Sequence, residues 1–222
     1  MLKYLLHLIW PSACPVCGAI GEDLCPSCCS ELIVPSGPVC LLCEGSLPCP
    51  THGNLEWYSA APHGGMAREL VLSLKYQGNG AIGLEMGIQM ASVFPKPEHA
   101  AIIPVPLHRG SPRKYNQARW IVAGISKVWG FPIVDKLRWN KTLSCQTSLD
   151  GSGRTEMPEN ALRWDGPCLN GREAVIVDDV KTTGTTLYRA YRALGEARPD
   201  RVRFITWSRS VVEKKGGISF GT

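Results

Sequence analysis

The feature that most constrains this chain is a set of cysteine pairs near its N-terminus. Eight of the ten cysteines lie between Cys14 and Cys49. Seven of these form, with one histidine, four pairs in which two positions separate the members: Cys14 and Cys17, Cys25 and Cys28, Cys40 and Cys43, and Cys49 and His52. A turn with this spacing brings two side chains to one tetrahedral ion, and two such turns complete a site. The pattern therefore predicts two zinc sites.

These zinc sites are expected to be structural. Four protein ligands for each ion leave no coordination position for water, which catalytic zinc requires. A segment of about 40 residues buries little apolar surface, so the metal would supply much of its folding energy. Spacing does not say which pairs share an ion, and sequential and interleaved pairings both stay open. Cys29 is adjacent to a ligand and is expected to be a spare.

Two other interpretations of the cysteines are open to the sequence. A disulfide framework is typical of secreted domains, but the regular spacing and the weak N-terminal export signal disfavour it. The segment 11–14 weakly resembles a lipoprotein cleavage site, and lipidation would remove Cys14 from the zinc ligands. We expect zinc, because the spacing is that of metal ligands.

Charge divides the chain at about the same place as cysteine content. Residues 1–56 hold one cation, Lys3, against five carboxylates, which gives −4, so the remainder of a chain with net charge +5 carries +9. We expect a zinc-ribbon module at 1–56, a second domain at 57–213 and a flexible tail at 214–222. The composition is globular, and no apolar run reaches the roughly 18 residues of a membrane span. The predicted location is cytoplasmic.

From residue 57 onward, strand-like and helix-like patterns alternate. We expect strands at 57–61, 100–105, 173–177 and 201–207, and helices at 66–76, 82–94, 116–129 and 184–194. The apolar run at 174–177 is typical of a strand that is buried in a parallel sheet. Strand, helix and strand within 173–207 predict a right-handed crossover. The expected fold class is α/β with a parallel sheet.

The most informative segment follows that buried strand. Two carboxylates, Asp178 and Asp179, stand at its expected end, and a loop then opens a helix. The loop residues are Val180, Lys181, Thr182, Thr183, Gly184, Thr185 and Thr186. Free N–H groups at the helix start, threonine hydroxyls and a glycine suit a phosphate, while the acids suit sugar hydroxyls or a bound cation. A helix cap would explain one threonine but not the whole set.

This segment resembles the signature of type I phosphoribosyltransferases. Four further stretches resemble motifs of the ComF family, which joins a double zinc ribbon to a domain of that type: 74–78, 103–108, 115–118 and 146–161. The resemblance implies 5-phosphoribosyl 1-pyrophosphate (PRPP) as ligand, with Mg²⁺, and Asp178 and Asp179 as catalytic residues. It also implies a link to DNA uptake in competent bacteria. The segment between the second and third of these stretches is shorter here than is usual in the family.

The resemblance also implies a segment that contacts the pyrophosphate. Its candidates are Pro106, Leu107, His108, Arg109, Arg113 and Lys114, with Arg154 from a glycine-containing loop that is expected to act as a lid. A solvated basic loop is the alternative.

Three hypotheses about function follow from these observations. The first is a phosphoribosyltransferase whose acceptor the sequence does not identify. The second is a non-catalytic PRPP sensor that binds single-stranded DNA or a protein of the competence machinery, for which the basic body is better suited than the acidic head. A third hypothesis is a purely structural zinc protein in which the two acids and the loop are vestigial.

Overall fold

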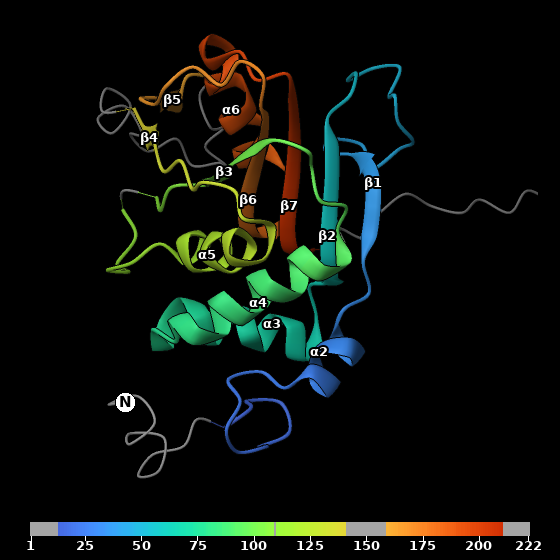
Figure 1. Ribbon diagram of the computed structural model, residues 1–222, viewed down its shortest axis with the longest axis vertical. Coiled ribbons are helices and arrows are strands. Elements are labelled where there is room, and N and C mark those ends of the chain that lie inside the picture. Colours follow the sequence, from blue (N-terminus) through green and yellow to red (C-terminus); the bar gives the residue numbers. More distant parts are fainter. Residues whose placement is uncertain (1–12, 109, 141–158, 211–222) are drawn as a thin grey trace, which may run out of the picture.

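The computed structural model describes residues 13–108, 110–140 and 159–210 (Figure 1). In chain order its elements are α2 (Pro26–Leu32), β1 (Ser36–Cys40), β2 (Glu56–Pro62), α3 (Gly65–Leu72), the π-helical turn η1 (Ser73–Gln77), α4 (Gly80–Val93), β3 (Ala100–Pro104), α5 (Gln117–Trp129), β4 (Leu137–Trp139), β5 (Leu162–Trp164), β6 (Glu173–Lys181), α6 (Thr185–Ala193), the 3₁₀ turn η3 (Gly195–Ala197) and β7 (Arg201–Arg209).

A five-stranded sheet forms the centre of the molecule, in the order β1-β2-β7-β6-β3. The strands β2, β7, β6 and β3 run parallel, and β1 pairs antiparallel with β2 at the edge. The parallel pairs are joined through helices, as crossover connections require. The strands β4 and β5 form a separate antiparallel pair. The α/β fold class with a mostly parallel sheet is therefore confirmed.

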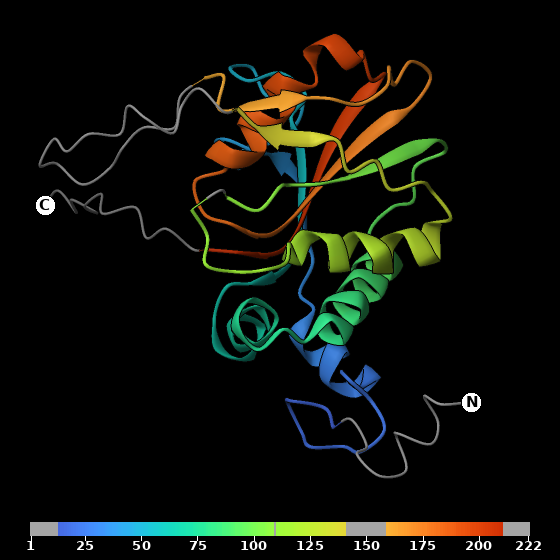
Figure 2. The ribbon, with the colours of Figure 1, turned by 90° about the vertical axis from the view of Figure 1, so that its left-hand side faces the viewer.

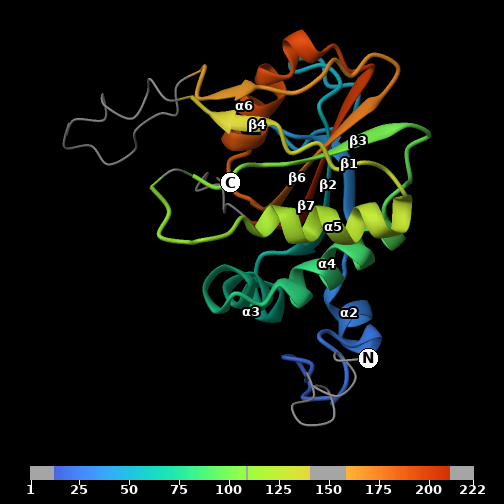
Figure 3. The same ribbon diagram turned by 60° about the vertical axis from the view of Figure 1, so that its left-hand side comes forward.

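Alternate residues of each central strand point to opposite faces of the sheet, and both faces are covered. On one face, Val175 and Val177 pack against α3, α4 and α5. On the other face, Ala174 and Ile176 pack against α6 and the β4–β5 pair. Figures 2 and 3 show the sheet between these two layers. Burial on both faces explains why the strand sequences are continuously apolar.

Two glycines allow the helices α4 and α5 to cross in close contact. A Cβ atom at Gly87 would lie 2.0 Å from the carbonyl oxygen of Ile121, and one at Gly124 would lie 2.0 Å from that of Leu84. A side chain at either position would force the helices apart. The crossing fixes where α5 begins, and that helix start borders the site described below.

The expected strands and helices of the body are present, with one difference that matters for the site. The strand at 173–177 continues to Lys181, so Asp178 and Asp179 lie within β6 and not after it. The expectation that the strand ends before the acids was wrong, because hydrogen bonding to β7 continues as far as the pair Lys181–Arg209. Its other neighbour, β3, ends opposite Val177.

The sequence did not predict that the cysteine-rich segment also supplies a strand of the central sheet. The strand β1 precedes the boundary expected at residue 56 and pairs with β2, which begins at that residue. The division at residue 56 remains a prediction. The expected tail at 214–222 and the expected lid at 146–154 lie outside the described residues. Within the described ranges, no helix has the length and apolarity that crossing a membrane requires.

Candidate functional site

The loop between β6 and α6 forms a small hollow. Gly184 adopts a left-handed conformation (φ +81°), and α6 begins at the next residue. The hydroxyls of Thr183 and Thr185 are 2.9 Å apart, and the Thr185 N–H donates to the Thr183 hydroxyl. Asp178 and every residue from Val180 to Leu187 line the hollow. The predicted phosphate-binding residues are therefore together at the start of a helix, where N–H groups favour an anion.

The two carboxylates lie on the part of β6 that extends beyond the end of its neighbour β3. Because β3 ends opposite Val177, the strand beyond this point pairs only with β7. The gap opens into a cleft of about 220 Å³. Its lining residues are Lys75, Val105, Pro106, Leu107, His108, Arg113, Asn116, Gln117, Trp139, Asp178, Asp179 and Thr186. Asp178 and Thr186 line both the cleft and the loop hollow, so the two form one continuous site.

The carboxylates differ in their surroundings. Asp179 is buried, and its Oδ2 lies 3.2 Å from the Lys75 ammonium. Burial raises the pKa of Asp178 to about 8, with a further contribution from the charge of Asp179, while Lys75 and Arg113 oppose the change. Desolvation and a neighbouring like charge both favour the protonated acid. A cation or hydroxyl donors bound beside the pair would favour the ionised form of Asp178.

The segment after β3 contributes Pro106, Leu107 and His108 to the lining of the cleft. The Val105 N–H donates to the Val177 carbonyl, and the indole N–H of Trp139 donates to the Pro106 carbonyl at 3.1 Å. The His108 ring lies edge-on to Trp139, with ring centroids 4.9 Å apart. Trp139 belongs to β4, so the antiparallel pair supports this segment.

The predicted basic residues are not all at the cleft. Arg113 lines it and donates from Nε to the Ser111 hydroxyl at 2.9 Å. Lys114 is exposed and is not among the lining residues. Arg109 and Arg154 lie outside the described residues.

The sequence did not single out Lys75 or Trp139 as residues of the site, and for Gln117 it left helix capping and ligand contact as equal alternatives. Lys75 reaches the cleft from η1, Trp139 from β4, and Gln117 from the first turn of α5. Lys75 and Trp139 come from segments that the sequence does not connect with the loop, and only the folded chain brings them there. Gln117 follows the helix cap Asn116, for which the sequence had left the same alternatives open.

The eight predicted metal ligands form two clusters. The first contains Cys14, Cys17, Cys25 and Cys28, and the second contains Cys40, Cys43, Cys49 and His52. The pairs that are adjacent in sequence share a cluster, which resolves the pairing that spacing had left open.

The geometry of both clusters fits zinc. The Sγ atoms of Cys17 and Cys25 are 3.6 Å apart, as are those of Cys43 and Cys49. The Nδ1 atom of His52 lies 3.5 Å from its nearest cysteine sulfurs. Tetrahedral zinc sets sulfur–sulfur distances at about 3.8 Å and sulfur–nitrogen distances at about 3.6 Å. Each cluster could therefore hold one structural zinc ion.

The second cluster lies against the loop between β6 and α6. The carbonyl oxygen of Leu41 would be 3.2 Å from a Cβ atom at Gly184. The Lys181 ammonium, which is buried, lies 2.6 Å from Oε1 of Glu44 and 4.3 Å from the centre of the Trp57 ring. Lys181 therefore directs its charge toward Glu44, the residue after Cys43, and its ion pair joins the loop to the cluster.

Comparison with known proteins identifies the class of the domain. Residues 128–214 match the model of the phosphoribosyl transferase domain. This stretch runs from the end of α5 beyond β7 and contains the two carboxylates and the loop. A search of curated proteins finds no match to the sequence.

Two solved structures have distantly similar folds. One is described as the allosteric regulatory enzyme of purine biosynthesis, with 20% identity and a TM-score of 0.39; the similarity covers 56% of this chain and 25% of that one. The other is a hypoxanthine phosphoribosyltransferase from Staphylococcus aureus, with 12% identity and a TM-score of 0.37, covering 60% of this chain and 73% of that one. The present chain thus spans a quarter of the first protein's length.

The fold and the domain match together define an α/β protein with a phosphoribosyltransferase-type domain and two N-terminal cysteine clusters. Transfer of a pentosyl group by a phosphoribosyltransferase is the enzymatic activity that the match supports.

Proposed function

We propose that this chain binds PRPP together with Mg²⁺ and transfers its phosphoribosyl group to a nitrogen nucleophile. The observation that carries the proposal is the continuity of the site: Asp178 and Thr186 line both the loop hollow and the cleft. A ligand that spans them would have its 5-phosphate on the threonine loop, its ribose hydroxyls at the carboxylates and its diphosphate toward Arg113.

The residues suit such a reaction. Helix α6 and the threonine hydroxyls bind the phosphate, which is remote from the reacting carbon and supplies energy for positioning. Asp178 and Asp179 orient the ribose and balance the positive charge that develops on it as the bond to diphosphate breaks. Asp178 and Asp179 would favour Mg²⁺ beside the ligand, and the ion would supply positive charge that offsets the charge of the leaving group. The Lys75 ammonium holds Asp179 in place.

The wider assignment is also a proposal. We place the chain with ComF-type proteins, with a zinc-ribbon module at 1–56, the phosphoribosyltransferase-type domain at 57–213 and a role connected with DNA uptake. The two clusters of four ligands and their order before the domain support this. A PRPP sensor without catalysis, which engages single-stranded DNA or a competence protein, is the alternative that the +9 body favours.

Calorimetry with PRPP and Mg²⁺ tests the proposal. Wild-type protein should bind, and replacing both acids by asparagine should weaken binding by about 100-fold or more, because two charged hydrogen-bonding partners of the ribose are lost. Asp165→Asn, which removes a similar charge at a residue that does not line the cleft, serves as the control. Failure of the wild type to bind would refute the proposal. Pyrophosphate release over a panel of bases and amines then separates transferase from sensor.

The pH dependence of binding follows from the raised pKa of Asp178. An acid with pKa of about 8 is mostly protonated at pH 7, and pairing with Mg²⁺ and ribose hydroxyls favours its carboxylate, so binding releases a proton. The affinity should therefore rise by up to about tenfold per pH unit below pH 8 and then level off. Calorimetry in buffers of different ionisation enthalpy measures the proton release. The release should disappear in Asp178→Asn, and an unchanged release would contradict the assignment.

A further inference from the structure

Gln117 carries a buried donor that has no partner among the described residues. It is the first residue of α5, and only 3% of its surface is exposed. Within the described part of the chain, its side-chain Nε2 makes no hydrogen bond. Nearly all buried polar groups in folded proteins are hydrogen-bonded, because leaving one unsatisfied destabilises the fold. Such a group requires a reason, and binding of a ligand is one.

Asn116, the residue before Gln117, makes the structural hydrogen bonds at the start of α5. The side chain of Asn116 donates from Nδ2 to the Val105 carbonyl at 2.8 Å and accepts from the Ala118 N–H at 3.1 Å. It caps α5 and ties this helix to the segment after β3. Gln117 is therefore not needed to cap the helix. Both residues line the same cleft.

The surroundings of the free amide favour an anionic oxygen as its partner. An amide nitrogen only donates, so its partner must be an acceptor. Lys75 and Arg113 line the same cleft, and the start of α5 adds the positive end of a 13-residue helix. The site thus has a second anion-favouring position, separate from the threonine loop at the start of α6.

We propose that Nε2 of Gln117 donates a hydrogen bond to an oxygen of the diphosphate end of the ligand. The assignment rests on the proposed function and deepens it. It gives the cleft a residue that distinguishes PRPP, which carries a diphosphate at C1, from ribose 5-phosphate, which does not. The threonine loop recognises what the two compounds share. Gln117 recognises the group that only the diphosphate carries.

The test uses Gln117→Met, which keeps the length of the side chain and removes its polar atoms. Calorimetry measures binding of PRPP, ribose 5-phosphate and inorganic pyrophosphate, each with Mg²⁺. We expect affinity for PRPP and pyrophosphate to fall by about tenfold, the effect of one hydrogen bond to a charged oxygen, while affinity for ribose 5-phosphate stays unchanged. Gln117→Glu should lose more, because it opposes one anion to another.

The melting temperature provides a second readout. If Gln117 had a purely structural role, its replacement would lower the melting temperature. The melting temperature of ligand-free Gln117→Met should equal or exceed that of the wild type, because an unsatisfied buried donor is removed. Gln89→Met is the matched control: its amide donates to Glu85 on α4, and its loss should leave all three affinities unchanged.

The outcomes separate this inference from the function on which it rests. If wild-type protein binds none of the three compounds, the proposed function fails and the inference with it. If the wild type binds PRPP and Gln117→Met binds it equally well, only the inference fails. A fall in affinity for ribose 5-phosphate as large as that for PRPP, or a lower melting temperature without a change in affinity, also overturns it.

Discussion

The two cysteine clusters have similar ligand sets but support different parts of the molecule. The first cluster lies beneath α3 and α4, at the end of the molecule away from α6 (Figure 1). The second follows β1 and contacts the loop before α6. Two clusters with the same spacing in sequence thus lie next to different elements of the fold. These elements determine what each metal ion would stabilise.

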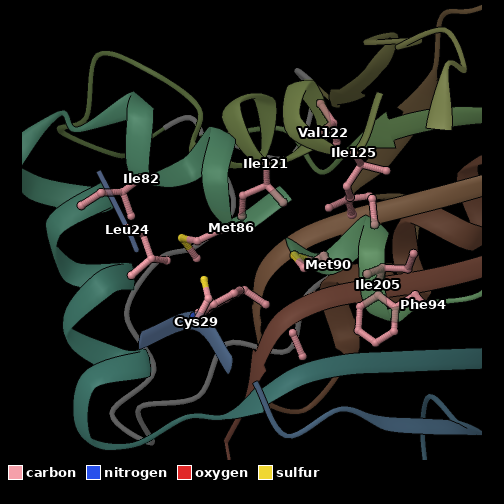
Figure 4. Close-up of a cluster of buried hydrophobic side chains, with 14 of the residues drawn as sticks. Leu24, Cys29, Ile82, Met86, Met90, Phe94, Ile121, Val122, Ile125 and Ile205 are labelled. Atoms are coloured by element: carbon pink, nitrogen blue, oxygen red, sulfur yellow. The ribbon is translucent and has the colours of Figure 1, made fainter. Parts of the chain in front are cut away.

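The first cluster is part of a hydrophobic core. Cys29, the spare cysteine beside Cys28, is buried together with Leu24. Both belong to the same cluster of apolar side chains as Ile82 and Met86 of α4, as the close-up shows (Figure 4). A metal ion here would hold α2 and its flanking turns against the helical layer, on the face of the sheet that α6 does not cover.

The second cluster is linked to the site by polar and backbone contacts. Glu44 binds the Lys181 ammonium, and the Leu41 carbonyl lies close to Gly184. The first cluster therefore supports the helical layer, and the second supports the loop between β6 and α6. Loss of metal from each should have separable effects.

The largest difference between the two clusters is expected when one ligand of each is removed in turn. Cys17→Ser and Cys43→Ser replace exposed cysteines, and each should lower bound zinc from two to one per chain. Cys43→Ser should weaken binding of ribose 5-phosphate by about tenfold or more, because the loop loses its support, whereas Cys17→Ser should change it by less than about twofold. Both should lower the melting temperature.

Metal analysis and calorimetry below the melting transition check this pair of variants. Circular dichroism at the same temperature verifies that both remain folded. Equal losses of affinity in the two variants would remove the distinction between the clusters.

The sequence predicted those parts of the site that depend on local order. All eight cluster residues could be predicted, because a spacing of two residues determines which side chains meet in one turn. The acids and the threonine loop could be predicted for the same reason. The assignment of pairs to clusters could not, because it depends on the path of the chain between the turns.

Long-range packing accounts for the remaining differences. The strand β1 contains Gly37 and Pro38, which are unfavourable in strands, and only its pairing with β2 makes it one. Lys75 reaches the cleft because η1 turns it toward β6, and no pattern near Lys75 indicates this. The buried donor of Gln117 likewise becomes evident only when its neighbours are known.

A smaller effect is expected from Glu44→Gln, which keeps all four ligands of the second cluster. Glu44 lies 2.6 Å from the buried Lys181 ammonium, and the variant leaves this charge without a carboxylate. Because Glu44 itself is partly exposed, the loss of stability should be about 1–2 kcal/mol. Affinity for ribose 5-phosphate should fall about threefold as the loop becomes less fixed, an effect well below that of Cys43→Ser.

The matched control for Glu44→Gln is Glu22→Gln, which removes an equal charge from an exposed position near the first cluster. It should leave both stability and affinity unchanged. Thermal unfolding and calorimetry measure the two quantities, and metal analysis should give two zinc ions per chain in both variants. If affinity rose in Glu44→Gln, the released ammonium would be binding the phosphate directly, and Glu44 would restrain Lys181 from the ligand instead of bracing the loop.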